Sequence, residues 1–532
     1  MPSPFALTSF LYGSAYGLLK IVWIVIAAVF LYDISVDTGQ FEIMKQSVAA
    51  ITPDRRLQLL LVAFCFGAFI EGCAGFGAPV AIAGAFMIGL GFKPFQAAAL
   101  NLIANTAPVA FGAIGIPIHA LIGVTALPES DVTAMIGRIL PITAVILPFW
   151  LVRAMVSWSE TLEVLPAILV VGISFAGTQF FWSNFMDSNL VDIAAGIVSL
   201  VSTLLFLRVW QPKRIWRFPE EREADAVKAA ASATASAGST QTAITDTLGD
   251  EWQIRQNPPL GAAAAAHYSA AQVARAWLPF AILSIFVLCW GIPTFKNAMG
   301  KATTPAFASG GWEVPYLHKA VYRAQPVAAK PTPEAAKFDF NWLTATGSAC
   351  FLAALLSGFL LGLKPPKLFQ IFGRTLFRLR FAILAMTCML GLGFVTRYSG
   401  MDAVLGLAFT RTGWFFPFFG AFIGWLGVAL TGSDTSSNVL FGGLQKITAQ
   451  QLGLSPVLMA ATNSAGGVMG KMIDAQSITI ATAATNQVGQ EGSIFRFVFW
   501  HSVSLAAIVG VIVMLYAYVA PQLIPHGLNF IH

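Results

Sequence analysis

The stretch that decides the fold is Thr431-Gly-Ser-Asp-Thr-Ser-Ser-Asn438, a polar run that directly follows the apolar stretch Trp425-Leu-Gly-Val-Ala-Leu430. A second polar and glycine-rich run, Asn463-Ser-Ala-Gly-Gly-Val-Met-Gly-Lys-Met-Ile-Asp-Ala-Gln-Ser477, follows after the turn sequence Gly453-Leu-Ser-Pro456. Irregular backbone and charge persist at membrane depth only where they are buried in protein or line a wet cavity. We therefore expect helices to break here inside a bilayer and to border a site for a solute.

The composition of the whole chain agrees with a membrane setting. Hydrophobic residues make up 57% and charged residues 11% of the 532 residues, and the mean hydropathy is +0.72. Soluble domains carry about 25% charged residues, so this chain reads as a polytopic membrane protein. The formal net charge is +6, but the basic residues gather at the ends of apolar stretches, which indicates orientation signals and not a nucleic-acid surface. The five cysteines have no paired spacing, so we expect no disulfide, no metal site and no cofactor.

The apolar stretches predict an all-α fold with about 12–14 membrane elements. A helix needs about 20 apolar residues to cross a bilayer. Two long interrupted stretches, 57–92 and 414–452, are typical of broken or re-entrant pairs. Single stretches of sufficient length fall near residues 9–31, 97–118, 138–158, 164–182, 190–210, 276–293, 343–363, 381–397, 456–482 and 494–520.

Lysine and arginine set the expected orientation. The densest basic junctions, Arg208–Arg217 and Lys364–Arg380, are assigned to the cytoplasm. The N-terminus, the acidic loop around Glu129 and the loop 294–342 then lie outside, and the segment 211–275 lies in the cytoplasm. Between about residues 224 and 271 the sequence is rich in Ala, Ser, Thr and Gly, and such a segment cannot bury enough apolar surface to fold. We therefore predict a first transmembrane half over 1–223 with its core at 57–118, a flexible cytoplasmic linker over 224–271, and a second half over 272–532 with its core at 414–482.

The two halves share sequence matches in the same order. Phe66-Gly-Ala-Phe-Ile70 recurs as Phe419-Gly-Ala-Phe-Ile423, and the pattern Gly-x-x-Pro-x-x-x-Ala-Ala-x-Asn occurs at 91–101 and at 453–463. The predicted orientation places the first copy's entry in the cytoplasm and the second copy's entry outside. The sequence therefore predicts two inverted repeats, the design in which transporters place broken helices around a site at mid-membrane.

The break of the first half is Glu71-Gly-Cys-Ala-Gly-Phe-Gly-Ala-Pro79. Its glycines free the backbone, and Pro79 suits a helix start because its missing N–H costs nothing there. A helix N-terminus that faces a cavity attracts anions. We therefore propose as substrate-binding candidates the residues at this break and at its counterpart in the second half, namely Gly72, Gly75, Gly77, Ser433, Thr435, Ser436 and Asn438.

Three acids and one lysine occur in these apolar segments. Glu71 is either a proton carrier, since burial favours its neutral form, or an acid that bonds the backbone N–H groups of the broken helix. Asp434 lies among hydroxyls in the predicted unwound segment, and we favour a site role for it. Asp474 is three residues from Lys471, so on a helix the two share a face, and for Asp474 we favour mutual neutralisation over a site role. Lys471 is otherwise the natural partner for a carboxylate, the alternatives being snorkelling to water or pairing with Asp434.

These residues resemble a known family. The motifs Glu71–Ile82, Asn105–Pro117, Leu430–Asn438 and Gly466–Ser477 are similar to those of the L-lactate permeases, which are bacterial proton symporters, and the resemblance extends from about Tyr12 to the C-terminus. It implies import of L-lactate, and of D-lactate or glycolate, with protons across the bacterial inner membrane. Members of that family usually carry two further apolar spans before the segment that begins here near Tyr12.

Our hypothesis from the residues themselves is that the carboxylate of lactate is held by the broken-helix N-termini and Lys471. The hydroxyl of lactate would bond Asn101, Asn463 or Gln476. Protons taken up by Glu71, Asp434 or Asp474 would let the loaded carrier cross without net charge. A homo-oligomer in the lipid bilayer is compatible with this reading.

Two other functions remain open from the residues alone. A channel or facilitator for small anions could use the same glycine-rich breaks, and a transporter of another anion, such as a dicarboxylate or an inorganic oxyanion, could use the same helix N-termini. Two cations at the site would favour a dicarboxylate, and only Lys471 is evident. No motif for a nucleophile, a nucleotide or a metal stands in a suitable context, so an enzyme is the least favoured class.

Overall fold

The computed structural model describes residues 3–49, 51–75, 77–219, 221, 268–292, 294–295, 298–300, 311–324, 331–338, 340, 342–487 and 489–525. Nearly all of the predicted linker falls outside these residues, and its last two positions, 270 and 271, already belong to a helix. The division of the chain into two halves stays a prediction.

The described chain is almost entirely helical, and the predicted all-α polytopic membrane fold is confirmed. Eight helices of the described ranges are long and apolar enough to cross a membrane, or up to ten when two bent pairs are each taken as one span. Two further apolar helices, α6 and α16, are shorter. Strands occur only as two antiparallel pairs in the described part of the 311–338 segment, β1 (Trp312–Glu313) with β4 (Lys337–Phe338) and β2 (Tyr322–Arg323) with β3 (Thr332–Pro333).

Twelve helices of the described part of the chain lie outside the two broken cores that are described in the next paragraph, and they are called the outer helices here. They are α1 (Ser3–Tyr16), which continues through a π-helical segment into α2 (Trp23–Asp37), and then α3 (Gln40–Ala49), α9 (Glu129–Met155), α10 (Trp158–Glu163), α11 (Leu165–Phe185), α12 (Val191–Val209), α14 (Ala270–Gly291), α16 (Thr346–Leu360), α17 (Pro365–Ser399), α18 (Met401–Phe409) and α23 (Glu491–Tyr518).

The core of each half is a broken hairpin followed by a broken crossing helix. In the first half the chain enters through α4 (Arg55–Leu59), a π-helical segment η2 (Leu60–Phe66) and α5 (Gly67–Cys73), returns through α6 (Ala78–Gly89), and then crosses through α7 (Pro94–Ala104) and α8 (Gly112–Thr125). In the second half the corresponding elements are α19 (Phe416–Thr431), α20 (Asp434–Gln451), α21 (Pro456–Gly470) and α22 (Ala475–Ala484).

Glycines with positive φ open both hairpins. Gly75 and Gly77 have φ of 56° and 82°, and Gly432 has φ of 75°. Residues with a Cβ rarely adopt this conformation, so these positions end the incoming helix and redirect the chain. The second break is shorter than the sequence predicted. Only Gly432 and Ser433 are unwound, and Asp434 to Asn438 form the first turns of α20, because the side chain of Ser433 caps that helix.

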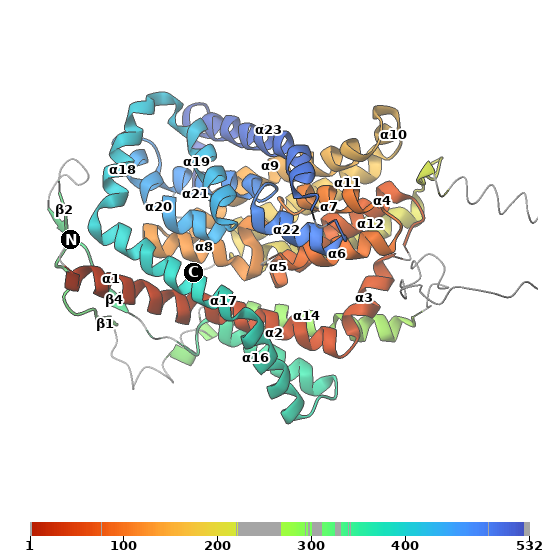
Figure 1. Cartoon of the computed structure of the whole chain (residues 1–532), viewed down its shortest axis with the longest axis horizontal. Coiled ribbons are helices and arrows are strands. Elements are labelled where there is room, and N and C mark those ends of the chain that lie inside the picture. Colours follow the sequence, from red (N-terminus) through yellow and green to blue (C-terminus); the bar gives the residue numbers. More distant parts are fainter. Residues whose placement is uncertain are drawn as a thin grey trace, which may run out of the picture.

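The two cores pack against each other reciprocally. The return arm α20 packs on α8, and the return arm α6 packs on α22, so each hairpin leans on the crossing helix of the other half. Figure 1 shows these orange and blue elements side by side in the centre of the molecule. Helix order and packing are alike in the two cores, and their relation as two inverted repeats stays a prediction.

The two sequence matches differ in their structural value. Pro94 and Pro456 begin α7 and α21, and Asn101 and Asn463 stand at the same place in these helices. The match between Phe66–Ile70 and Phe419–Ile423 is not equivalent. The first ends three residues before α5 ends, and the second ends eight residues before α19 ends. Only the match that includes the prolines therefore falls at equivalent positions of its two helices.

Candidate substrate cavity

The breaks of both halves meet at one cavity. It has a volume of about 180 Å³. Its wall comes from the end of α5, the start of α8, the middle of α17, the α19–α20 break and the α21–α22 break. The lining residues are Glu71, Gly75, Val109, Gly112, Ala113, Ile116, Pro117, Ala385, Met386, Met389, Thr431, Gly432, Ser433, Asp434, Thr435, Ser436, Lys471 and Gln476.

The first turn of α20 supplies the most polar wall. The Ser433 hydroxyl accepts a hydrogen bond from the backbone N–H of Ser436 at 3.3 Å and caps the helix. Asp434 is buried, and its Oδ2 accepts hydrogen bonds from Ser464 at 2.6 Å and Asn438 at 3.2 Å. Its Oδ1 has no hydrogen-bond partner among the described residues. This wall therefore presents a helix N-terminus, which favours anions, together with a carboxyl that can hold a proton.

Lys471 brings a positive charge to the cavity wall. It is buried, its Nζ donates to the carbonyl of Gly432 at 2.6 Å, and it lies 3.3 Å from Oδ2 of Asp474. The other oxygen of Asp474 accepts from the N–H of Ser477 and caps α22. The pairing expected from the spacing is present, although it sits in the turn between α21 and α22 and not on a helix face.

Glu71 lies at the end of α5 and is 5% exposed. Its Oε2 has no hydrogen-bond partner among the described residues, and the amide of Asn105 lies beside the carboxyl. A Cβ at Gly112 would come within 2.6 Å of Oε1 of Glu71, so the glycine makes room for the carboxyl. The absence of a side chain at Gly112 thus lets the Glu71 carboxyl reach the cavity.

The start of α8 is strained where it borders the cavity. Ala113 and Ile114 have φ of 46° and 60°, which is uncommon for residues with a Cβ and rarest for a β-branched one. Just after this kinked segment, the carbonyl of Pro117 accepts a hydrogen bond from Asn438 of α20 at 3.1 Å. Such strain persists where surrounding structure enforces it and is frequent at functional sites.

Several predicted site residues lie outside the cavity wall. Asn101 donates to the carbonyl of Val80 at 2.6 Å, and Asn463 donates to Asn438 at 2.9 Å, so each ties a crossing helix to the return arm of its own hairpin. Neither amide lines the cavity, and a role for them in binding a substrate hydroxyl stays a prediction. The other predicted residues absent from the wall are Gly72, which packs on α12, Gly77, which packs on Ile480, Asn438, and the helix cap Asp474.

Two parts of the wall, one on α8 and one on α17, were not among the predicted site residues. The segment Val109–Pro117 belongs to a motif that supported the family resemblance, and its glycine pair Gly112 and Gly115 was a usable signal. Met386 and Met389 gave no local signal, because α17 reads as an ordinary apolar span and only its bend brings it to the cavity.

The cavity wall combines a positive charge with groups that can hold a proton. Its lining holds one cation, Lys471, and two acids, Glu71 and Asp434. No group of three or more metal-binding side chains occurs anywhere in the described ranges. The wall therefore offers helix N-termini, hydroxyls, an ammonium group and protonatable carboxyls, which can bind and release a solute.

Comparisons with known proteins agree with one another. The family model for L-lactate permease matches residues 1–520. The L-lactate permease of Escherichia coli is 47% identical over 99% of this chain and 89% of its own, and the glycolate permease GlcA of the same organism is 47% identical over 98% and 88%. The L-lactate permease of Bacillus subtilis is 43% identical over 99% and 90%.

One solved structure shows a weak overall likeness. MtrF of Neisseria gonorrhoeae has a TM-score of 0.45 and 10% identity over 97% of this chain and 84% of that one, which is too low to support an argument. The family match, by contrast, spans nearly the whole chain and includes every break that borders the cavity. The chain belongs to the L-lactate permease family.

Proposed function

We propose that this protein is a secondary active transporter that imports L-lactate, and also D-lactate and glycolate, together with protons across the bacterial inner membrane. The E. coli and B. subtilis relatives are named as permeases for lactate or glycolate. The observation that carries the proposal is the single cavity in which broken helices of both halves bring together one buried lysine and two buried acids.

In this proposal the carboxylate of the substrate lies between Lys471 and the first turn of α20. Hydroxyls of Ser433, Thr435 and Ser436 border the same space, and Gln476 is the wall amide that can bond the 2-hydroxyl group. A single lysine suits a monocarboxylate better than a dicarboxylate, since a second carboxylate would lack a positive partner on the wall.

Proton coupling follows from the charges around the cavity. If Glu71 and Asp434 were both ionised, the wall would already carry more negative than positive charge before a monocarboxylate arrived. Burying a further anion in that setting is costly, so substrate binding favours protonation of one of the acids. The loaded carrier then moves with less net charge through a low-dielectric region.

The test is uptake of labelled L-lactate into proteoliposomes with the purified protein. An inwardly directed proton gradient is expected to drive accumulation, and unlabelled glycolate and D-lactate are expected to compete with it. Uptake that ignores the gradient would remove the proton role and favour a facilitator or channel.

Glu71→Gln examines the proposed proton carrier. It is expected to keep exchange of labelled for unlabelled lactate, because substrate still enters, but to lose accumulation under a gradient. Glu313→Gln serves as control, since Glu313 of β1 is 62% exposed and does not line the cavity. Accumulation by the Glu71 variant at the control's level would exclude Glu71.

A further inference from the structure

Asp192 is a buried acid that the proposed mechanism leaves without a role. It lies in the first turn of α12 and is 0% exposed. Neither carboxyl oxygen has a hydrogen-bond partner among the described residues. A buried carboxylate without partners is costly, so such a group is kept neutral or is charged only transiently.

Asp192 stands next to Glu71. A Cβ at Gly72 would come within 2.8 Å of the backbone N of Ile193 and 3.1 Å of the backbone C of Asp192, so α5 and α12 touch through their main chains at this point. The Glu71 carboxyl acts electrostatically on that of Asp192. Gly72, which was expected to bind substrate, instead allows this close approach of two acid-bearing helices.

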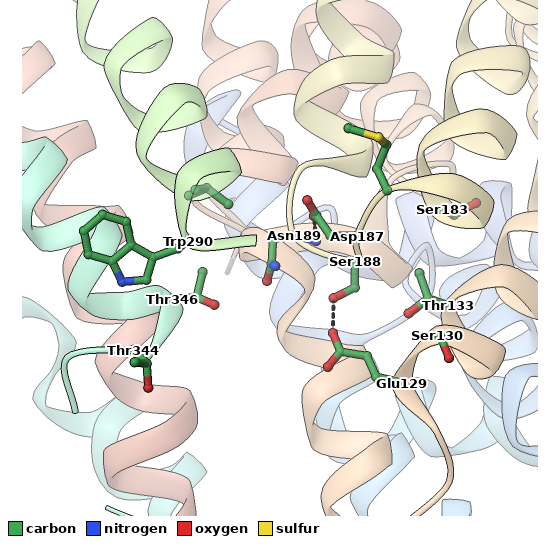
Figure 2. Close-up of a pocket in the computed structure, with 12 residues that line it drawn as sticks. Glu129, Ser130, Thr133, Ser183, Asp187, Ser188, Asn189, Trp290, Thr344 and Thr346 are labelled. Atoms are coloured by element: carbon green, nitrogen blue, oxygen red, sulfur yellow. Dashed lines mark hydrogen bonds between the residues drawn. The ribbon is translucent and has the colours of Figure 1, made fainter. Parts of the chain in front are cut away.

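A second polar cavity lies beside the loop that precedes α12. Figure 2 shows its wall, where Ser188 donates to Glu129 at 2.6 Å, with Asp187 and Asn189 close by. The cavity volume is about 210 Å³. The buried hydroxyl of Thr133 also lines it and has no partner among the described residues, which leaves room for water. Asn189 is only three residues before Asp192, so α12 leads directly from this cavity to the buried acid.

Two polar residues of α11, Ser183 and Gln179, connect the second cavity to the surroundings of Asp192. Ser183 lines the second cavity, and its hydroxyl donates to the carbonyl of Gln179 at 2.6 Å, one turn deeper. The side chain of Gln179 is fully buried and lies beside Asp192, while its amide donates to the carbonyl of Ala107 at 3.3 Å. Ala107 belongs to the break between α7 and α8, so this connection ends at the core.

We propose that Asp192 is a second proton-carrying residue, which passes protons between the cavity at Glu129 and Asp187 and the carboxyl of Glu71. This inference rests on the proposed proton-coupled transport. The step transfers one proton from the neutral Asp192 carboxyl to the Glu71 carboxylate and leaves Asp192 ionised. Asp192 then regains a proton from the outside solution through water in the second cavity, and Glu71 releases its proton with the substrate on the cytoplasmic side, so charge and atoms balance in each turnover.

The other titratable groups on the elements packed against α12 face other partners than Asp192. Cys65 of η2 contacts Ser199, which lies two turns beyond Asp192, and Cys73 of α5 lies toward Cys350. His119 of α8 bonds to Asn189 at 2.9 Å and lies 3.7 Å from Glu129, so it belongs to the rim of the second cavity. Helix α11 carries no ionisable side chain. Glu71 is thus the acid that Asp192 meets on the core side.

The experiment compares Asp192→Asn with the wild type in lactate-loaded proteoliposomes that contain a pH-sensitive dye. The variant is expected to keep lactate exchange at the wild-type rate but to lose both gradient-driven accumulation and the lactate-dependent proton flux. Asp192→Glu keeps a carboxyl and is expected to restore proton flux. Asp131→Asn is the matched control, because Asp131 is a nearby buried acid outside the wall of the second cavity and should keep full coupling.

The outcomes separate this inference from the proposed function. If the wild type moves no protons with lactate, the proposed function fails first. If the wild type is coupled and Asp192→Asn is equally coupled, the relay is wrong while the function stands. If Asp192→Asn loses exchange as well as accumulation and Asp192→Glu does not recover it, Asp192 supports the fold or the substrate site, and the relay is again wrong.

Discussion

At the scale of single residues, Lys471 is bonded within the protein and also lines the cavity. It is paired with Asp474 at 3.3 Å and held by the carbonyl of Gly432, yet it also lines the cavity. A lysine that only neutralised Asp474 and a lysine that received a substrate carboxylate could share this geometry. Asp474 can be made neutral without loss of its helix cap, because Asn caps as well as Asp does.

Lys471→Gln is expected to weaken lactate binding. A hydrogen bond to a charged group contributes about 1.5–3 kcal/mol, which corresponds to roughly a 10- to 100-fold loss of affinity. Asp474→Asn alone is expected to keep most of the affinity, and the double variant should remain as weak as Lys471→Gln. Titration calorimetry of the purified variants with L-lactate measures the difference. Recovery of wild-type affinity in the double variant would mean that Lys471 serves only Asp474.

The charged residues that line the cavity could be predicted from sequence, whereas the direction in which the Asn101 and Asn463 amides point could not. Glu71, Asp434 and Lys471 interrupt apolar runs, and a charge in such a run is itself a signal of a cavity. Asn101 and Asn463 carry no comparable signal, since a buried amide can satisfy either a substrate or a neighbouring backbone. Their direction is decided by packing, and here both point to the return arm of their own hairpin.

At the scale of elements, α19 and α21 form the tightest helix pair of the second core. Gly420 and Gly424 of α19 face α21, and Gly466 and Gly470 of α21 face α19, so both helices use small residues four apart. Helices in membranes associate through such close backbone approach, because lipid offers no hydrophobic gain for their contact. This pair supports the turn that carries Lys471.

Gly466→Ala is expected to destabilise the protein. The new Cβ would come within 2.6 Å of the backbone C and Cα of Ala421, and backbone atoms cannot move aside as a flexible side chain can. Overpacking of this kind costs about 1–3 kcal/mol, so the melting temperature in detergent should fall. Gly373→Ala is the control, since nothing lies within 4 Å of its position on α17 and the melting temperature should hold or rise. Equal melting temperatures for both variants would contradict the close packing.

Helix positions were predictable, but the extent of each break was not. Apolar length and the prolines at 79, 94 and 456 marked the starts of helices, and α6, α7 and α21 have these prolines in their first turn. The polar run after Leu430 looked unwound over its full length, yet Ser433 caps a helix that takes up most of it. Polar residues at helix starts and in unwound segments are the same residue types, so composition alone does not separate them.

At the scale of the whole molecule, the loops gather at two ends that agree with the charge-based orientation. At one end Arg56 binds Asp54, Glu163 at 2.8 Å and the carbonyl of Arg214, and Arg214 belongs to the junction assigned to the cytoplasm. At the other end Arg323 binds Glu334 and Asp402, and Arg323 and Glu334 belong to the loop 294–342 assigned to the outside. Figure 1 shows α4 and α10 at one end of the long axis and α18 with the strands at the other. The contacts fix which loops share a side, and the basic residues supply the expected direction.

Two cysteine substitutions can therefore orient the entire chain. Tyr316→Cys lies in the end assigned to the outside, where Tyr316 is 74% exposed, and Lys213→Cys lies at an exposed position of the opposite end. In a background without the five native cysteines, a membrane-impermeant maleimide is expected to label Tyr316→Cys in intact cells and Lys213→Cys only after permeabilisation. Because each end is held together by ion pairs, these two sites report on every loop that shares their end. The reverse pattern would turn the protein over and put the cavity at Glu129 in the cytoplasm, whereas labelling of both sites from one side would refute the arrangement of the two ends.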